Sequence, residues 1–106
     1  MKDKFSTAKN IQLASKGFAI VDEEFYPSLM LHKWQLHKGT WDKVGYATRR
    51  KMVRGKVFHL YLHHSILPKL KGFDVDHKNG NTLDNRRSNL RYLTHRENSI
   101  SHKESK

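Results

Sequence analysis

The sequence contains no cysteine among its 106 residues. Disulfide bonds, thiolate zinc sites and cysteine nucleophiles are therefore excluded, and any metal must be held by His, Asp, Glu, Asn or water. It also lacks a run of about 18 apolar residues, so no segment is expected to span a bilayer. The N-terminus has no apolar core of the kind found in signal peptides. Together these absences predict a cytoplasmic protein with no membrane partner.

Acidic residues are scarce relative to basic ones. Lys and Arg number 21 against 10 Asp and Glu, which gives a formal net charge of +11. Solubility does not require such an excess, so we expect a polyanionic partner, and we prefer nucleic acid over an anionic membrane surface. The length suits one domain, and with 36% hydrophobic residues its core is expected to be small.

The first 64 residues predict a strand-rich half. Residues 1–16 are polar and are expected to form an extension that adds little to the core, ahead of a single domain over 17–106. Pro27 is expected to interrupt a short helix or turn within residues 23–34. Apolar alternation predicts three strands, the last two joined as a hairpin, at 17–22, 45–50 and 56–64.

The second half predicts the order strand, loop, strand, helix. A strand-like "FDVD" begins at residue 73, and Asn79-Gly80 is a strong turn signal. "NLRYLT" is a second short strand. Thr94 and Glu97 fit a capping box that starts a helix running to about residue 102. The fold class expected from this pattern is α+β with a small antiparallel sheet.

Three polar residues can converge in this arrangement. Asp76 and His77 end the first strand, and Asn98 lies in the first turn of the helix. Carboxylate and amide oxygens are hard ligands that suit Mg²⁺ or Mn²⁺. A neutral imidazole at His77 is able to deprotonate a water near pH 7.

The stretch "DHKNGNTLDNRRSNLRYLTHREN" resembles the HNH nuclease signature in the form found in phage and homing endonucleases. The similarity extends over roughly residues 17–102. It implies N-terminal strands over 17–64 and a ββα-metal motif over 72–104. It also implies hydrolysis of DNA with the help of one divalent cation, which leaves 5′-phosphate and 3′-hydroxyl ends. The cellular setting it implies is a bacterial host, with the protein encoded by a phage. The matching positions are Asp76-His77, Gly80, Asp84-Asn85, Asn89-Leu90-Arg91, Thr94 and Glu97-Asn98.

The resemblance also implies roles for these residues. His77 is the expected general base, and Asn89 is expected to hydrogen-bond across the loop and hold the backbone of His77. Asp76 and Asn98 are the expected metal ligands, and His102 is a further candidate because it shares a helix face with Asn98.

Basic residues supply the expected contacts to DNA. His63 matches the upstream "LH" of the family, and a supporting role or a role close to DNA is expected for it. The protein is expected to act as a monomer or homodimer. The arginines predicted to bind DNA are Arg49, Arg50, Arg54, Arg86, Arg87, Arg91 and Arg96. A solvated hairpin tip is the alternative reading of residues 49–54, with phosphate contact preferred.

Two other function classes compete with a nuclease. One is a catalytically silent DNA-binding module with the same fold, against which the intact metal and base positions count. The other is a structural zinc module, for which His32 and His37 are the available ligands. Asp84 and Asn85 are expected to shape the loop without touching metal.

Overall fold

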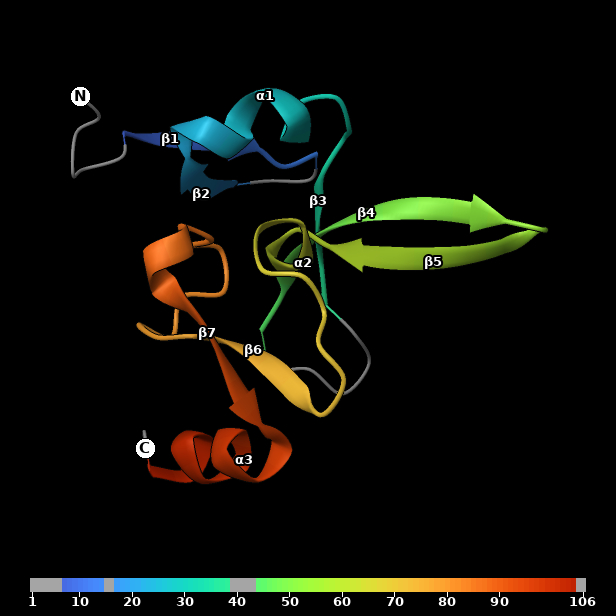
Figure 1. Cartoon of the computed structure of the whole chain (residues 1–106). Helices are drawn as coiled ribbons and strands as arrows, with labels where there is room; N and C mark the ends of the chain where they lie inside the picture. Colours follow the sequence, from blue (N-terminus) through green and yellow to red (C-terminus); the bar gives the residue numbers. More distant parts are fainter. Residues whose placement is uncertain (1–6, 15–16, 39–43, 105–106) are drawn as a thin grey trace.

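The computed structural model describes residues 7–14, 17–38 and 44–104, with side chains described up to residue 100. Within these ranges the strands form three separate antiparallel sheets (Figure 1). The first pairs β1 (Ala8–Gln12) with β2 (Phe18–Asp22). The second has the order β3 (Gln35–His37), β4 (Tyr46–Val53), β5 (Lys56–Tyr61). The third pairs β6 (Phe73–His77) with β7 (Leu90–Thr94).

Helical segments are short except for the last one. A 3-10 turn (Glu23–Phe25) leads into α1 (Tyr26–Leu29), and α2 (His63–Ile66) follows β5. A second 3-10 turn (Arg87–Asn89) precedes β7, and α3 (His95–Glu104) follows it. The described residues therefore confirm the predicted α+β class and the predicted order of strand, loop, strand and helix. No helix in the described ranges is long and apolar enough to cross a membrane.

The expectation that residues 1–16 add little to the core is wrong for residues 8–13. β1 pairs with β2, and both Ile11 and Leu13 are only 1% exposed. These two apolar residues alternate with polar ones, so a strand places both on one face and buries them together. The first strand of the domain thus lies inside the predicted extension.

Two predicted elements change shape for local reasons. Pro27 lies in the first turn of α1 instead of interrupting a helix, because that turn needs no hydrogen bond from a proline nitrogen. The strand expected over 56–64 ends at Tyr61, where the chain turns into α2.

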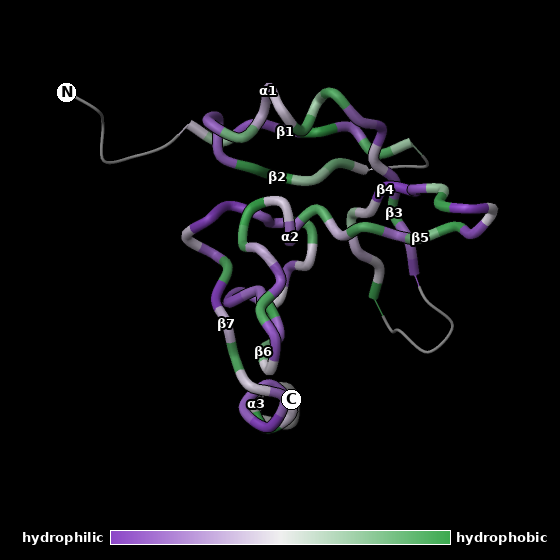
Figure 2. The backbone as a smooth tube through the Cα atoms, turned by 45° about the vertical axis from the view of Figure 1, so that its right-hand side comes forward, coloured by the Kyte–Doolittle hydropathy of each residue, from purple (hydrophilic) through white to green (hydrophobic). Residues whose placement is uncertain are grey.

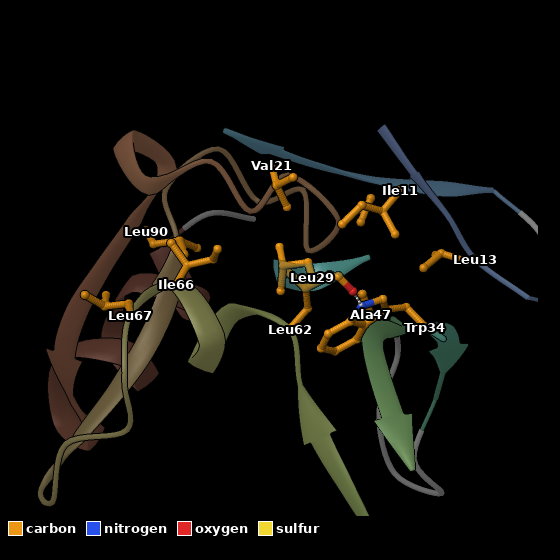
Figure 3. Close-up of a cluster of buried hydrophobic side chains, with 11 residues drawn as sticks. Ile11, Leu13, Val21, Leu29, Trp34, Ala47, Leu62, Ile66, Leu67 and Leu90 are labelled. Carbon is orange, nitrogen blue, oxygen red and sulfur yellow. Dashed lines mark hydrogen bonds between the residues drawn. The ribbon is translucent and has the colours of Figure 1, made fainter. Parts of the chain in front are cut away.

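One buried apolar cluster joins the sheets and the short helices (Figure 3). Trp34 lies within it, 2% exposed, and its indole Nε1 donates a hydrogen bond of 2.8 Å to the carbonyl oxygen of Leu29. The core residues are Ile11, Leu13, Ala19, Val21, Leu29, Trp34, Ala47, Leu62, Ile66, Leu67 and Leu90. Trp34 is therefore a core residue.

The loop between β6 and β7 is attached to the N-terminal sheet. Ile20 donates its backbone N–H to the carbonyl oxygen of Leu83 at 2.8 Å and accepts one from Asn85 at 2.7 Å. Asp22 accepts the backbone N–H of Arg87 on its side chain at 2.7 Å. β2 therefore fixes the loop that follows His77.

The predicted capping box is confirmed at the start of α3. Thr94 accepts the backbone N–H of Glu97 at 3.1 Å, and Glu97 accepts the backbone N–H of Thr94 at 2.9 Å. This pair sets the direction in which α3 leaves β7 and so positions Asn98 against β6.

Candidate active site

His77 is the last residue of β6 and its side chain is buried. Its Nε2 lies 2.8 Å from the side-chain oxygen Oδ1 of Asn85. An amide oxygen only accepts hydrogen bonds, so Nε2 carries the hydrogen and donates it. In the neutral ring the lone pair is then on Nδ1. The structure thus orients the imidazole and defines which nitrogen is able to take a proton.

The environment keeps this imidazole neutral. Burial lowers the pKa of His77 below its ordinary value, more than the hydrogen bond to Asn85 and the charges of Asp76 and Asp84 raise it. A general base must be unprotonated before it acts, and a lowered pKa favours that form. Once the ring is protonated, the same neighbouring carboxylates and the Asn85 oxygen stabilise the imidazolium.

Asn89 ties together the two ends of the loop that follows His77. Its amide nitrogen Nδ2 donates to the Asp84 carbonyl oxygen at 2.8 Å and to Asn79 Oδ1 at 3.0 Å. Its Oδ1 accepts the backbone N–H of Asn79 at 3.1 Å, and its carbonyl accepts that of Lys78 at 2.8 Å. The predicted cross-loop hydrogen bonds are therefore present, and they hold the backbone directly after His77.

The two aspartates of β6 point to the face covered by α3, because residues two apart share a face of a strand. Asp76 is buried and accepts a hydrogen bond of 2.8 Å from Nε of Arg91, its partner across the β6–β7 pair. Asp74 accepts hydrogen bonds from His95 Nδ1 at 2.8 Å and from Asn98 Nδ2 at 3.1 Å. The amide of Asn98 is thus drawn to this acidic face from the helix.

The other end of that amide is unusual. Oδ1 of Asn98 is buried and makes no hydrogen bond with the residues whose side chains are described. A buried polar atom without a partner is costly and calls for an explanation such as a missing ion. Carboxylate and amide oxygens are the ligands that Mg²⁺ and Mn²⁺ prefer, and the Asp74 carboxylate lies next to this amide. The donor types of Asp74 and Asn98 therefore fit a divalent cation, and Asp76 lies on the same strand face as Asp74.

A cation at this place would not be held by acidic and histidine side chains alone. The described residues contain no group of three or more His, Asp or Glu placed to hold a metal. An amide ligand, water and a phosphate oxygen would have to complete the coordination. The side chain of His102, the third predicted ligand, lies outside the described side chains.

A pocket of about 280 Å³ opens beside these groups. Its wall includes Asp74, Asn98, Tyr61 and His63. The ring of His63 lies 5.2 Å from that of His77. The pocket therefore borders Asp74 and Asn98, and His77 lies next to one of its lining residues.

His63 is buried and stacks on Tyr61, with ring centroids 5.1 Å apart. Burial, followed by the neighbouring His64 and His77, lowers the pKa of His63 to about 3. The ring is therefore neutral at physiological pH, so it has no charge with which to attract a phosphate. Of the two roles expected for His63, the structure favours support of the site over a charged contact to DNA.

Residues 61–100 match the model of a family described as HNH endonuclease. This segment is therefore similar to HNH endonucleases. The match includes β6, the loop, β7 and the start of α3, which are the elements that carry His77, Asn89 and Asn98. Searches of curated proteins and of solved structures found no match.

The arginines of the HNH segment are partly engaged within the protein. Arg86 forms two hydrogen bonds with the Asp84 carboxylate, at 2.8 and 2.7 Å, and Arg91 bonds Asp76. Nη1 of Arg87 lies 3.4 Å from the Leu90 carbonyl oxygen. Arg96 lies exposed on α3. Arg86 and Arg91 therefore have structural partners as well as their predicted role at DNA.

The arginines upstream of the HNH segment lie on the β4–β5 hairpin. The guanidinium of Arg49 lies 5.9 Å from the ring centroid of Trp34. Arg50 is exposed on β4, and Arg54 is exposed in the turn at the tip. These positions leave the charged groups of the hairpin close to solvent.

Sequence reasoning assigned no site role to two residues. Asn85 was expected only to shape the loop, yet it orients the His77 ring. Asp74 was given no role in the site, yet it bonds the Asn98 amide. The alternation in "FDVD" could have revealed Asp74, because it places Asp74 on the same strand face as Asp76. No local signal reveals the contact of Asn85, because it depends on how the loop folds back.

The histidines considered for a zinc site do not converge. His32 packs edge-on against Trp34, and His37 stacks on His59 with ring centroids 3.9 Å apart. The described residues contain no group of three or more His, Asp or Glu that could hold a metal, so they give the zinc module no support.

Proposed function

We propose that the protein is an endonuclease that hydrolyses DNA phosphodiester bonds with the help of one divalent cation, Mg²⁺ or Mn²⁺. The observation that carries this proposal is the oriented, neutral imidazole of His77, which directly follows Asp76 and lies in the same segment as an amide oxygen of Asn98 that has no partner among the described residues. The match of residues 61–100 to the HNH endonuclease family model supports the same function.

In the proposed reaction, Nδ1 of His77 takes a proton from a water molecule. The water oxygen attacks phosphorus, and the bond between phosphorus and the 3′ oxygen breaks with its electron pair on that oxygen, which takes a proton from solvent. Nε2–H continues to donate to Asn85, so the ring does not turn during the transfer. Asn89 keeps the backbone after His77 fixed, which maintains the distance to the phosphate.

Asp76 and Asn98 would hold the cation, with Asp74 beside them. Asp74 accepts a hydrogen bond from Nδ2 of Asn98, so the orientation of that amide leaves the oxygen Oδ1 available as a metal ligand. When bound, the cation would stabilise negative charge on the phosphate and the leaving oxygen. Arg91 neutralises the Asp76 carboxylate across the sheet and so reduces repulsion between the two aspartates.

The described residues contain one such centre, so a single copy would cut one strand, and a double-strand break would require two copies. The exposed basic groups of the hairpin and of α3 would bind phosphates on either side of the cut. These are the guanidiniums of Arg50, Arg54 and Arg96, with Arg49, Arg86, Arg87 and Arg91 contributing the donors that their internal bonds leave available.

The test is nicking of a supercoiled plasmid with Mg²⁺ or Mn²⁺, with and without a chelator. His77→Gln is expected to lower turnover by roughly two to four orders of magnitude, the usual contribution of a general base, while DNA affinity changes little. His32→Gln is the matched control, because His32 is exposed and lies against Trp34, away from the pocket. Equal loss of turnover and affinity in His77→Gln would remove the assignment of the base.

The competing function is DNA binding without cleavage. It predicts DNA binding that is insensitive to chelator, together with an intact plasmid under every metal. That result would overturn the proposed hydrolysis and leave the basic surface as the functional feature.

A further inference from the structure

The β4–β5 hairpin extends away from the rest of the molecule (Figure 1). Its turn is formed by Arg54 and Gly55, whose φ angles are 50° and 81°. Positive φ at both central residues is the geometry of the tight type I′ turn, which matches the natural twist of two paired strands. The hairpin is therefore a narrow two-stranded ribbon with a compact tip.

Large apolar side chains lie exposed close to that tip. Met52 is 65% exposed and lies opposite Val57 in the strand register, while Phe58 is 47% exposed and lies on the other face. Val53, beside the turn, is exposed as well. Figure 2 shows these hydrophobic segments alternating with hydrophilic ones along the hairpin. A cluster of exposed large apolar residues marks a contact surface.

The charge around this cluster is of one sign. Residues 44–73 contain no Asp or Glu. The hairpin carries five cationic side chains, which are Arg49, Arg50, Lys51, Arg54 and Lys56. A surface that is apolar at its centre and cationic at its borders is complementary to DNA, whose stacked bases are apolar and whose backbone is anionic. Charge complementarity thus favours DNA over a protein partner.

One face of the hairpin leads directly to the candidate active site. Residues two apart along β5 share a face, so Tyr61, His59 and Val57 lie on the same side. Tyr61 lines the pocket and stacks on His63, the neighbour of His77. From Tyr61 to Val57 the strand rises by roughly 14 Å, which corresponds to about four base pairs.

We propose that the hairpin tip acts as a wedge. Met52, Val57 and Phe58 insert between stacked base pairs from the minor groove, about four base pairs from the cleaved bond, while the flanking cations hold the phosphates. This inference rests on the proposed function, since it takes DNA as the substrate and adds that the substrate is unstacked and unwound locally when it binds.

Unwinding is measurable without knowledge of a target sequence. A plasmid is relaxed by a topoisomerase that needs no metal, in chelator and in the presence of the intact protein, and its linking number is then measured after the protein is removed. Wild type is expected to shift the linking number in proportion to the protein bound. The triple variant Met52→Ser, Val57→Ser, Phe58→Ser is expected to lose this shift and to bind DNA roughly tenfold more weakly, a common contribution of one stacked side chain.

Two control variants separate the wedge from charge and from exposed apolar surface in general. Leu31→Ser removes an apolar side chain that is 79% exposed outside the hairpin, and it is expected to unwind DNA like wild type. Arg54→Gln is expected to lower the slope of log affinity against log salt by about one while keeping the unwinding per bound molecule. Met52→Gln alone tests the same wedge with the smallest risk to folding, because Met52 is so exposed.

Each outcome decides the matter. Equal unwinding by wild type and by a correctly folded hairpin variant would overturn the wedge. A second result would also overturn it: wild type is a dimer that does not unwind DNA, and the hairpin variant is a monomer. The apolar tip would then be a contact between copies of the chain. Wild type that unwinds DNA yet never nicks it with Mg²⁺ or Mn²⁺ would overturn the nuclease and keep the wedge, whereas nicking without unwinding would do the reverse.

Discussion

Removing the side chain of Asn98 tests the cation site through stability instead of activity. Its buried Oδ1 makes no hydrogen bond, and its Nδ2 donates one to Asp74. An unpartnered buried polar group costs about 1–3 kcal/mol, whereas one ordinary hydrogen bond contributes about 0.5–1.5 kcal/mol. Alanine also has the higher helix propensity, by several tenths of a kcal/mol. Asn98→Ala is therefore expected to raise the unfolding free energy of the metal-free protein by about 1 kcal/mol.

In the presence of cation the expected effect of Asn98→Ala reverses. A ligand at roughly a hundredfold excess over its Kd stabilises the folded state by about 2.7 kcal/mol. For a domain of this size that corresponds to a rise in Tm of roughly 10 °C. Wild type is expected to show this rise with Mn²⁺ or Mg²⁺, and Asn98→Ala is expected to lose most of it.

The assay is thermal unfolding followed by circular dichroism, in chelator and at increasing metal concentration. Asn10→Ala, at an exposed position of β1, is the matched control and should respond to metal like wild type. A metal-free Asn98→Ala protein that is several kcal/mol less stable would show that Oδ1 has a partner in solution. An unchanged metal response in that variant would refute the role of Asn98 as a ligand.

Three further predictions concern the surroundings of the base. Asn85→Asp places a carboxylate against the His77 ring, which should raise its pKa and shift the acidic limb of the pH–rate profile upward, and an unshifted profile would argue against their contact. Asn89→Ala should lower the unfolding free energy by about 1–3 kcal/mol and reduce nicking in parallel, because the Asp84 carbonyl oxygen and the Asn79 backbone N–H lose their partner. Full activity with unchanged urea unfolding would contradict this. His63 is neutral when folded because its pKa is lowered to about 3, so below its ordinary pKa only the unfolded chain binds the proton. Stability should thus fall by about 2 kcal/mol between roughly pH 7 and pH 5, and His63→Phe should flatten that slope in urea titrations.

Features with a local cause could be predicted from the sequence. The capping box of Thr94 and Glu97 depends on two residues three apart, and it formed as expected. The Asn-Gly turn likewise appears with Gly80 at φ 80°, a conformation that glycine adopts without strain. The strands that flank this loop followed from apolar alternation for the same reason.

Features that depend on distant partners could not be predicted. β1 was missed because two buried residues in a polar stretch give a weak pattern until β2 is beside them. The pairing of Asp76 with Arg91 requires the β6–β7 register, and the bond from Asn98 to Asp74 requires the angle of α3. Each of these contacts lies in the site, which is why its residue types were easier to predict than its internal hydrogen bonds.

The attachment of the β6–β7 loop to β2 has a consequence for modularity. Asn85, which orients the His77 imidazole, receives its own position from a backbone bond to Ile20, far outside the segment that matches the HNH family. A transplant of residues 61–100 into another scaffold would carry His77, Asn89 and Asn98 yet lose the strand that positions Asn85. The smallest portable unit with the proposed activity is therefore larger than the segment that matches the family.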